Sequence, residues 1–460
     1  MHAPQADRSL RLARAARLSA LTLTALPWLA ALPAHAQTGP GKSEEPLTLD
    51  ASIRARFETI DGQFRPGAPD SGALMLRTLL RAEYRTGAVR IGAEIEDARV
   101  YFEHDNAPIG TTEVDAVEPV QAFLAVKTGR TTEWTLGRMT MDLGSRRFVS
   151  RQAFRNSTNA YTGVRFDWRP EKGSGITAFW TMPQDRMPND SDGIHDNRVK
   201  LDRERLEQQF FGFNANKAKL VGNVGIELFG YRLVERDAPN FATRNRRLWT
   251  VGGRVLRAPA RNRTDFEFEG AWQGGTTHAS AAASDRAALP VDAHFIHAAL
   301  GHSFAAPWSP RVQLAYDYAS GDTKARSYGR FDTLFGARVF EYGPSSLYGP
   351  IARANLQSVE ARVEVKPGKR ADSYLAVRPL WLASATDSFA GTGVKDAKGV
   401  SGRYAGTQID ARLRRWLMPD RLRLGVGAAM LIKGRFLTDA PNAPARGDTH
   451  YAFSELTLTL

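Results

Sequence analysis

Cysteine is absent from the sequence of 460 residues. Without it the chain forms no disulfide bonds, which reinforce many small exported domains. A chain of this length without disulfides must be held together by packing and backbone hydrogen bonds alone.

Long apolar runs are also absent once the first 36 residues are set aside. A helix needs about 20 predominantly apolar residues to span a bilayer, and no later segment supplies them. The first residues have the order of a secretory signal peptide, because a basic leader precedes an apolar run at 18–32 and a small-x-small site at 34–36. The basic residues of the leader are Arg8, Arg11, Arg14 and Arg17. We therefore predict a cleaved signal peptide at residues 1–36 and an exported chain that begins at Gln37.

Acidic residues are too few to balance the basic ones, since the chain has 49 aspartates and glutamates against 62 lysines and arginines. The formal net charge is +13, and loss of the leader with its four arginines and one aspartate leaves about +10. Such a basic balance favours nucleic acid, a membrane surface or an anionic ligand as partner. Because export argues against nucleic acid, we expect a membrane surface or an anionic solute.

Apolar and polar residues alternate in many short segments of the chain. In residues 47–58 one face carries Leu49, Ile53 and Phe57, while Arg54 lies on the other. A period of two residues places alternate side chains on opposite faces of a strand. Glycine and phenylalanine are plentiful, with 40 and 23 copies, as is typical of all-β proteins.

About 18 such segments follow one another, and weak alternation in an even number of strands is the signature of a bacterial outer-membrane barrel. They cover residues 47–58, 76–85, 89–96, 118–128, 132–139, 161–168, 175–183, 208–217, 222–234, 247–256, 264–273, 293–304, 310–318, 357–366, 373–383, 406–414, 421–432 and 450–460. The sequence therefore predicts an all-β fold with a single closed antiparallel transmembrane β-barrel at residues 47–460. Residues 37–46 are expected to form a flexible periplasmic tail.

The connections between these segments alternate between short and long. Short ones include 86–88, 128–131, 169–174, 257–263, 305–309 and 367–371, and long ones include 98–117, 184–207, 274–292, 319–356 and 384–405. Outer-membrane barrels have short periplasmic turns and long extracellular loops, whereas a soluble β-sandwich has no reason for this regularity. The apolar faces should then meet lipid, and the polar faces, rich in arginines and carboxylates, should line the lumen.

The connection after residue 139 is unusually basic. Residues 138–155 contain five arginines, offset only by Asp142. We expect this connection to fold into the lumen and narrow it, because guanidinium groups at a constriction select for anions. Two alternatives remain: the loop arginines face water or bind lipopolysaccharide phosphates at the rim, or the strand arginines are consumed in structural ion pairs.

No other segment carries a specific chemical signal. Residues 189–196 look like half of a calcium loop but lack the spacing and closing glutamate of an EF-hand, so an exposed polar loop is the preferred interpretation. His294 and His297 should point to opposite faces of their strand, and His302 does not complete a metal site. No nucleophile and base are paired as catalysis requires. We predict neither enzymatic activity nor a cofactor nor a metal.

Several motifs resemble the alginate-export family of outer-membrane porins. They are LGRMTMDLGSRR at 136–147, RNSTNAYTG at 155–163, YDYASGD at 316–322, FDTLFG at 331–336 and YG at 348–349. The resemblance covers residues 47–460 and implies a monomeric barrel of 18 strands with an arginine-rich, electropositive constriction for a polyuronate. The arginines that fit both the alternation and the motifs, and are predicted to line the pore and bind anions, are Arg54, Arg77, Arg138, Arg146, Arg147, Arg155, Arg362 and Arg412.

These observations predict a passive channel in the bacterial outer membrane. The expected solute is an anionic polysaccharide or oligosaccharide similar to alginate. Outer-membrane lipid, lipopolysaccharide and periplasmic export proteins are the expected partners. The alternatives are a general anion-preferring porin for small nutrients, an envelope enzyme that uses the barrel as a scaffold, and an adhesive barrel whose loops bind partners.

Overall fold

The computed structural model describes residues 46–323 and 327–460. The predicted signal peptide and nearly all of the predicted tail lie outside the described residues. The account below concerns the compact unit formed by residues 46–459.

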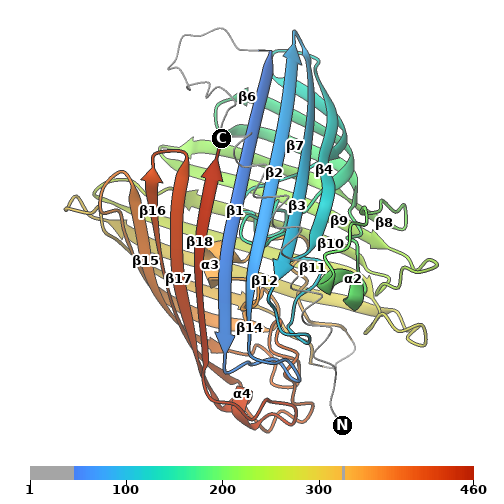
Figure 1. Cartoon of the computed structure of the whole chain (residues 1–460), viewed down its shortest axis with the longest axis vertical. Coiled ribbons are helices and arrows are strands. Elements are labelled where there is room, and N and C mark those ends of the chain that lie inside the picture. Colours follow the sequence, from blue (N-terminus) through green and yellow to red (C-terminus); the bar gives the residue numbers. More distant parts are fainter. Residues whose placement is uncertain (1–45, 324–326) are drawn as a thin grey trace. The chain divides into compact units, whose positions relative to one another are not determined.

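Eighteen strands form one antiparallel sheet. Their bounds are β1 Leu47–Asp61, β2 Ser71–Thr86, β3 Val89–Tyr101, β4 Asp115–Lys127, β5 Thr132–Met139, β6 Tyr161–Glu171, β7 Ser174–Pro183, β8 Gln208–Val221, β9 Val224–Glu235, β10 Arg247–Arg257, β11 Arg263–Thr277, β12 Leu289–Ser303, β13 Arg311–Ala319, β14 Leu356–Val365, β15 Ala371–Trp381, β16 Tyr404–Met418, β17 Leu422–Lys433 and β18 Thr449–Thr459. Each strand pairs with its neighbours in sequence, and β1 pairs with β18, so the sheet closes on itself (Figure 1). The predicted barrel of 18 strands is confirmed.

The two rims of the barrel differ in the length of their connections. At the rim where β1 begins and β18 ends, successive strands are joined by short turns such as 87–88 and 222–223. At the opposite rim the connections are long, the longest being 320–355 between β13 and β14. In Figure 1 the dark blue β1 and the red β18 run antiparallel and side by side. In outer-membrane barrels the short turns lie on the periplasmic side and the long loops outside.

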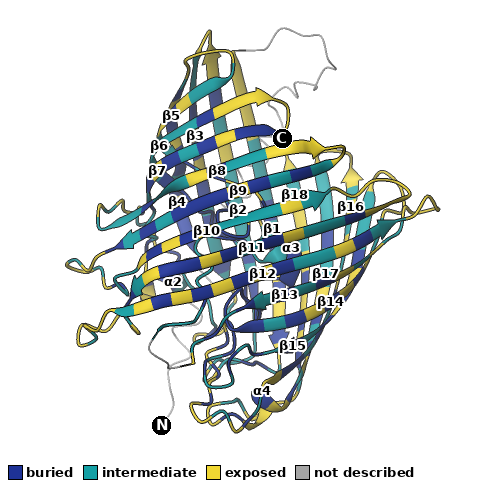
Figure 2. Ribbon diagram, turned by 180° about the vertical axis from the view of Figure 1, so that it is seen from behind, coloured by how far each residue is buried: buried dark blue, intermediate teal, exposed yellow. Residues whose placement is uncertain are grey.

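The strands bury one face and expose the other in alternation, which appears in Figure 2 as bands of dark blue and yellow. In β1 the side chains of Arg54, Arg56 and Glu58 are buried, whereas Leu49 and Phe57 are 62% and 46% exposed. The outward face is therefore apolar, as contact with lipid requires, and the charges face inward.

The prediction that the polar faces line the lumen holds for strands such as β1 but fails for part of the wall, where aromatic side chains point inward. Phe179, Phe210, Phe229 and Phe295 come from strands, yet all four are buried on the inward face. They pack against aromatic side chains of connections that enter the barrel, such as Phe148, whose ring centroid lies 5.1 Å from that of Phe229. Alternation alone does not reveal these inward aromatic residues, because their apolar partners come from connections distant in sequence.

In the part of the chain that the structure describes, three short helices lie in the long connections. They are α2 Ser191–His195, α3 Val339–Tyr342 and α4 Arg435–Asp439. No helix in residues 46–323 and 327–460 is long and apolar enough to cross a membrane.

A charge placed on the outward face near the middle of a strand is expected to destabilise the barrel. Val251 lies near the middle of β10 and is 42% exposed on the outer face. Val251→Arg is expected to lower the free energy of unfolding by about 2–4 kcal/mol, because a guanidinium at the bilayer midplane loses its hydration. Leu220→Arg, beside the short turn after β8, should cost only about 0–1 kcal/mol. Reversible urea unfolding in lipid vesicles compares the two, and equal losses would contradict the assigned lipid-facing surface.

Candidate functional site

The arginine-rich connection 140–160, between β5 and β6, lies inside the barrel. We call it the first inward connection. The guanidinium of Arg54 on β1 donates hydrogen bonds to the carbonyl oxygens of Ala153 and Arg155, at 2.9 and 3.0 Å. Arg56, two residues further along the same inward face, donates to the carbonyl of Phe154 and lies 4.0 Å from the centre of its ring. Both arginines therefore use their charge to hold this connection against the wall.

Asn156 and Thr158 attach the first inward connection to the neighbouring strands. The amide of Asn156 donates to the carbonyl oxygens of Leu76 on β2 and Arg99 on β3, at 3.1 Å each. The backbone N–H of Thr158 donates to the carboxylate of Glu96 on β3 at 2.8 Å. Asn156 is fully buried, so these contacts are protected from water. One end of the connection is thus fixed to β1, β2 and β3.

The other end of the first inward connection reaches the opposite wall through Arg147. Its guanidinium forms ion pairs with Glu267 and Glu269 on β11 and with Glu341 in α3. Arg147 is only 3% exposed. The connection therefore crosses the lumen from β1–β3 to β11, which confirms that it folds inward.

A second connection enters the lumen between β13 and β14. We call its described residues 327–355 the second inward connection. Val149 and Phe335 form a parallel bridge between the two inward connections. The N–H of Phe335 donates to the carbonyl of Phe148 at 3.0 Å. A β-carbon on Gly336 would lie 1.7 Å from the carbonyl oxygen of Arg147, so only glycine allows this close approach.

Glu341 is the electrostatic centre of the contact between the two inward connections. It accepts hydrogen bonds from Arg147 and from Arg353, which is fully buried. Burial alone would raise the pKa of Glu341, but the charges of Arg147 and Arg353 outweigh burial and hold that pKa at about 2. Two strand arginines close the group, since Arg362 and Arg378 each donate to the carbonyl of Glu341 at 3.3 Å.

The lowered pKa of Glu341 predicts an acid-induced loosening of the lumen. An unfolded glutamate titrates near 4.3, so the stability that ionised Glu341 contributes is fully present above about pH 5 and is lost as pH falls toward 2. Single-channel conductance should be constant from about pH 5 to 8 and should rise reversibly below about pH 4. Glu341→Gln should already show the raised conductance at neutral pH. A conductance that is the same at pH 3 and pH 7 would contradict this role.

Four of the eight arginines predicted to bind anions are committed to carboxylates. Arg138 pairs with Glu118 and with Glu204, the latter at 2.6 Å, and Arg147 is paired as described. Arg362 lies 3.2 Å from Glu360, and Arg412 lies 3.3 Å from Asp372. Three of these four lie on strands and match the alternative that the strand arginines are consumed in structural ion pairs. Arg147 lies in the first inward connection and is paired in the same way.

The other four are less engaged. Arg54 has one long ion pair of 3.7 Å with Glu455. Arg77 donates to the carbonyl oxygens of Ala153 and Arg155, at 3.4 and 3.3 Å. Arg146 is exposed and lies 5.0 Å from the ring centre of Phe340. Among the described residues, no carboxylate lies within ion-pairing distance of Arg77, Arg146 or Arg155.

Arg155 belongs to a group of arginines contributed by four long connections, which we call the arginine cluster. Its members are Arg65, Arg155, Arg186 and Arg338. All four are partly exposed, and none forms an ion pair within residues 46–323 and 327–460. Glu113 is the carboxylate whose field reaches Arg65, Arg155 and Arg338. The cluster therefore carries positive charge that the surrounding side chains do not neutralise.

Mutual repulsion within the arginine cluster appears in the pKa values. Burial, followed by the charges of Arg338 and Arg186, lowers the pKa of Arg155 to about 9. Burial, followed by the charges of Arg65 and Arg353, lowers the pKa of Arg338 to about 10. With these pKa values Arg155 and Arg338 stay protonated at neutral pH, so the repulsion between them is a cost that a bound anion would relieve.

Three members of the arginine cluster were not singled out from the sequence. Arg65, Arg186 and Arg338 lie in connections, where the period-two pattern that identifies inward side chains does not apply. The backbone carbonyls that orient Arg65 belong to Leu347 and Tyr348, about 280 residues away, at 2.7 and 2.5 Å. The only available sequence signal was the presence of arginine in long connections, which does not distinguish the lumen from the outer rim.

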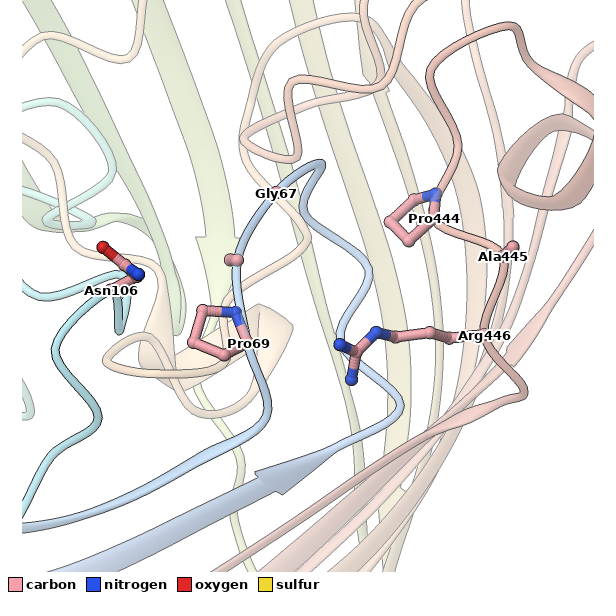
Figure 3. Close-up of a pocket in the computed structure, with 7 residues that line it drawn as sticks. Gly67, Pro69, Asn106, Pro444, Ala445 and Arg446 are labelled. Carbon is pink, nitrogen blue, oxygen red and sulfur yellow. The ribbon is translucent and has the colours of Figure 1, made fainter. Parts of the chain in front are cut away.

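A separate pocket of about 300 Å³ lies among long connections at the rim (Figure 3). Figure 3 shows Pro69, Asn106 and Pro444 around it, with Arg446 to one side. Arg446 forms an ion pair with Asp70. No member of the arginine cluster lines this pocket, so it is distinct from the candidate anion site.

The polar loop 189–196 and the histidines of β12, which were considered as metal sites, make hydrogen bonds within the fold. In the polar loop 189–196, Asp190 caps α2 by accepting a hydrogen bond from the N–H of Gly193 at 2.8 Å. His297 is buried with its Nδ1 2.8 Å from Asp317, whereas His294 is exposed on the other face of β12. The two histidines therefore point apart, as predicted.

Comparisons with known proteins agree with this architecture. The sequence profile of the Alginate export family matches residues 45–449, whereas no curated protein matches the chain. OccAB1 of Acinetobacter baumannii superposes with a TM-score of 0.60 at 14% identity, covering 90% of this chain and 97% of that one. OccAB2 of the same organism gives 0.59 at 14% identity, covering 90% and 98%. OccK3 (OpdO) of Pseudomonas aeruginosa gives 0.56 at 11% identity, covering 90% and 95%.

At such low identities the solved structures establish the shared fold, and the profile match establishes the relationship by sequence. The closed barrel and its apolar outer face are those of a protein that spans a membrane, and the family match identifies that protein as a channel. The chain belongs to the Alginate export family and is a non-enzymatic channel of the outer membrane.

Proposed function

We propose that the channel conducts an anionic polysaccharide or oligosaccharide, such as a polyuronate, across the outer membrane. The observation that carries the proposal is the arginine cluster, because several guanidinium groups without carboxylate partners meet where four long connections converge. Membership of the Alginate export family supports the same class of solute. The channel acts as a monomer and contributes no covalent chemistry.

The geometry of arginine suits a solute that carries one carboxylate on each sugar. A guanidinium donates two parallel hydrogen bonds to a carboxylate, and its charge persists at any physiological pH. Arg155 and Arg338 contact no carboxylate closely enough to form an ion pair among the described residues, so an entering uronate need not displace an internal partner. Because each contact is partly exposed to water, it is weak, and successive uronates bind and leave in turn.

The second candidate function is conduction of small anions or short oligosaccharides only. Both inward connections are buried against each other and against the wall, with Val149 of the first and Leu347 and Tyr348 of the second fully buried. A lumen filled in this way favours small anionic nutrients or short oligosaccharides if the connections stay in place during transport. Passage of a long polymer requires only that one hydrated sugar chain fits beside them.

Polymer block of the current separates the two candidates. The channel is reconstituted in a planar bilayer, and polyuronate or a neutral glucan of equal length is added to one side. We expect transient block by polyuronate at concentrations where the glucan has no effect, with block times that lengthen as the polymer lengthens. Block by the uronate monomer alone would favour the small-anion porin. Equal block by both polymers would contradict anion recognition.

Liposome swelling provides the matching transport measurement. Vesicles containing the channel should swell in isosmotic oligouronate faster than in a neutral oligosaccharide of the same size. The reverse order would refute the proposed solute class, because an unneutralised cationic lumen cannot favour the neutral sugar.

A further inference from the structure

Three carboxylates meet at one place near the long-loop rim. Asp115 and Glu118 belong to the first residues of β4, and Asp202 belongs to the connection 184–207 between β7 and β8. One oxygen of each lies within 4.8 Å of the others. Their side chains are 1%, 1% and 8% exposed in that order. We call this group the acidic triad.

A β-bulge brings two members of the acidic triad to the same side. Residues three apart in a regular strand lie on opposite faces, so Asp115 and Glu118 should point in opposite directions. The pairing of β3 with β4 shifts register between Glu96 and Ala98, and Val117 has a positive φ of 58°. Val117 itself is 43% exposed. The extra residue turns both carboxylates inward, which a bulge can do where it re-aims a side chain.

Local hydrogen bonds satisfy two members of the acidic triad but not the third. Glu118 pairs with Arg138 and accepts from the N–H of Asp202 at 2.9 Å, while Asp202 accepts from the N–H of Met187 at 2.7 Å. Neither carboxylate oxygen of Asp115 has a hydrogen-bond partner among the described residues, although both atoms are buried. A buried carboxylate without a partner is costly, and two further carboxylates beside it increase the cost.

Two arginines lie near the acidic triad, and neither donates a hydrogen bond to Asp115. Arg186 donates to the carbonyl of Thr158 at 3.2 Å and to the side chain of Asn159. Arg138 divides its charge between Glu118 and Glu204, the second at 2.6 Å. Arg186 acts on Asp115 and Asp202 through its charge alone, and Arg138 is shared with Glu204. The three carboxylates therefore exceed the positive charge beside them, and the site favours a further cation over an anion.

We propose that the acidic triad binds one Ca²⁺ ion. Calcium takes 6–8 oxygen ligands in flexible geometry, and three carboxylates can supply several of them, with water and backbone carbonyls completing the shell. Asp115 provides unused ligand atoms aimed into the site. The ion ties the β7–β8 connection to the bulge of β4, and it thereby fixes the connection that contributes Arg186 to the arginine cluster. This inference does not depend on the solute that the channel conducts.

Calorimetric titration tests the ion site directly. The full mature chain is refolded into detergent without lipopolysaccharide, because lipopolysaccharide itself binds divalent cations, and is treated with chelator before Ca²⁺ is added. We expect one site on the unmodified protein and at least a tenfold weaker affinity for Asp115→Asn and for Asp202→Asn. Asp196→Asn, in the exposed polar loop, serves as the control and should bind like the unmodified protein. No heat of binding up to millimolar Ca²⁺, or an unchanged affinity in Asp115→Asn, would overturn the proposal.

Thermal unfolding distinguishes a variant that has lost the calcium site from a variant that fails to fold. Asp115→Asn removes a buried, unpartnered charge without changing the shape of the side chain, so its midpoint without calcium should equal or exceed that of the unmodified protein. Calcium should raise the midpoint of the unmodified protein and of Asp196→Asn but not that of Asp115→Asn. If calcium leaves all three midpoints unchanged while Asp115→Asn is stabilised, the triad is held by protons and the calcium site is refuted.

Discussion

Replacing Arg147 by methionine is expected to release the two inward connections from the wall formed by β11. Methionine fills much of the same volume but leaves the carboxylates of Glu267, Glu269 and Glu341 without their shared guanidinium. Glu341 keeps its ion pair with Arg353, but Glu269 loses the guanidinium of Arg147 and stays buried. Removing one partner of a buried ion pair costs about 3–5 kcal/mol, because the charge left behind is buried and unpaired. The cost falls on the connections rather than on the strand ladder, so the barrel should persist.

The neighbouring residue provides a matched control for this prediction. Arg146 is exposed and has no ion pair within the described residues, so Arg146→Met should leave the conductance unchanged. Single-channel recording should show a larger and noisier conductance for Arg147→Met, and limited proteolysis should cleave residues 140–160 faster. If the two variants behave alike in both measurements, Arg147 does not hold the connections in place.

Neutralising Arg155 and Arg338 together is expected to remove most of the block by polyuronate. Each guanidinium is expected to contribute a charge-assisted hydrogen bond of about 1.5–3 kcal/mol to a uronate in the lumen, which corresponds to at least about a tenfold change in the dissociation constant for each. The double variant Arg155→Gln with Arg338→Gln should therefore weaken block by about a hundredfold. Its conductance for potassium chloride should change much less, since the substituted side chains keep most of their volume.

A control variant far from the arginine cluster shows whether the loss of block is due to the change in net charge alone. Arg421 and Arg415 lie at the short-turn end of the barrel and are exposed, so their double glutamine variant removes the same charge away from the arginine cluster. Block by polyuronate should be within about twofold of the unmodified channel, because exposed charges further apart than about 10 Å are screened at 0.1 M salt. Equal loss of block in both double variants would assign recognition to the overall field and not to the cluster.

The barrel could be predicted from the sequence because the patterns that indicate it, alternation and connection length, are local. Alternation in residues 47–58 identified Phe57 as outward and Arg54 as inward. In the structure β1 pairs with β2 and β18, and Arg54 is buried while Phe57 is exposed. Connection lengths separated the two rims, because a short turn can join only adjacent antiparallel strands. Strand ends were less accurate, since β2 begins at Ser71 and the sequence pattern began at residue 76.

The interior of the lumen depends on contacts that no local pattern encodes. The basic connection was correctly expected to fold inward, because guanidinium groups gathered at a constriction select for anions. Its partners, however, include Glu269 and Glu341, which are 122 and 194 residues from Arg147 in sequence. Alternation indicates only that Glu269 points inward. It does not indicate that Arg147 is neutralised while Arg155 is not.

The bulge in β4 is a second feature that local sequence patterns do not predict. Period-two spacing would place Asp115 and Glu118 on opposite faces, and Val117 carries no residue-type signal for a positive φ. The acidic triad forms only because the backbone departs from the regular strand and because Asp202 arrives from a distant connection. Sites built from irregular backbone require the structure for their detection.

The reversal potential of the open channel tests the central claim most directly. In a planar bilayer with a tenfold gradient of potassium chloride, the arginine cluster should favour chloride over potassium, and the potential should take the sign of an anion-selective pore. The preference should weaken in the Arg155→Gln, Arg338→Gln double variant. A reversal potential of the opposite sign, or an absence of current, would contradict the account of this protein as an anion-conducting channel.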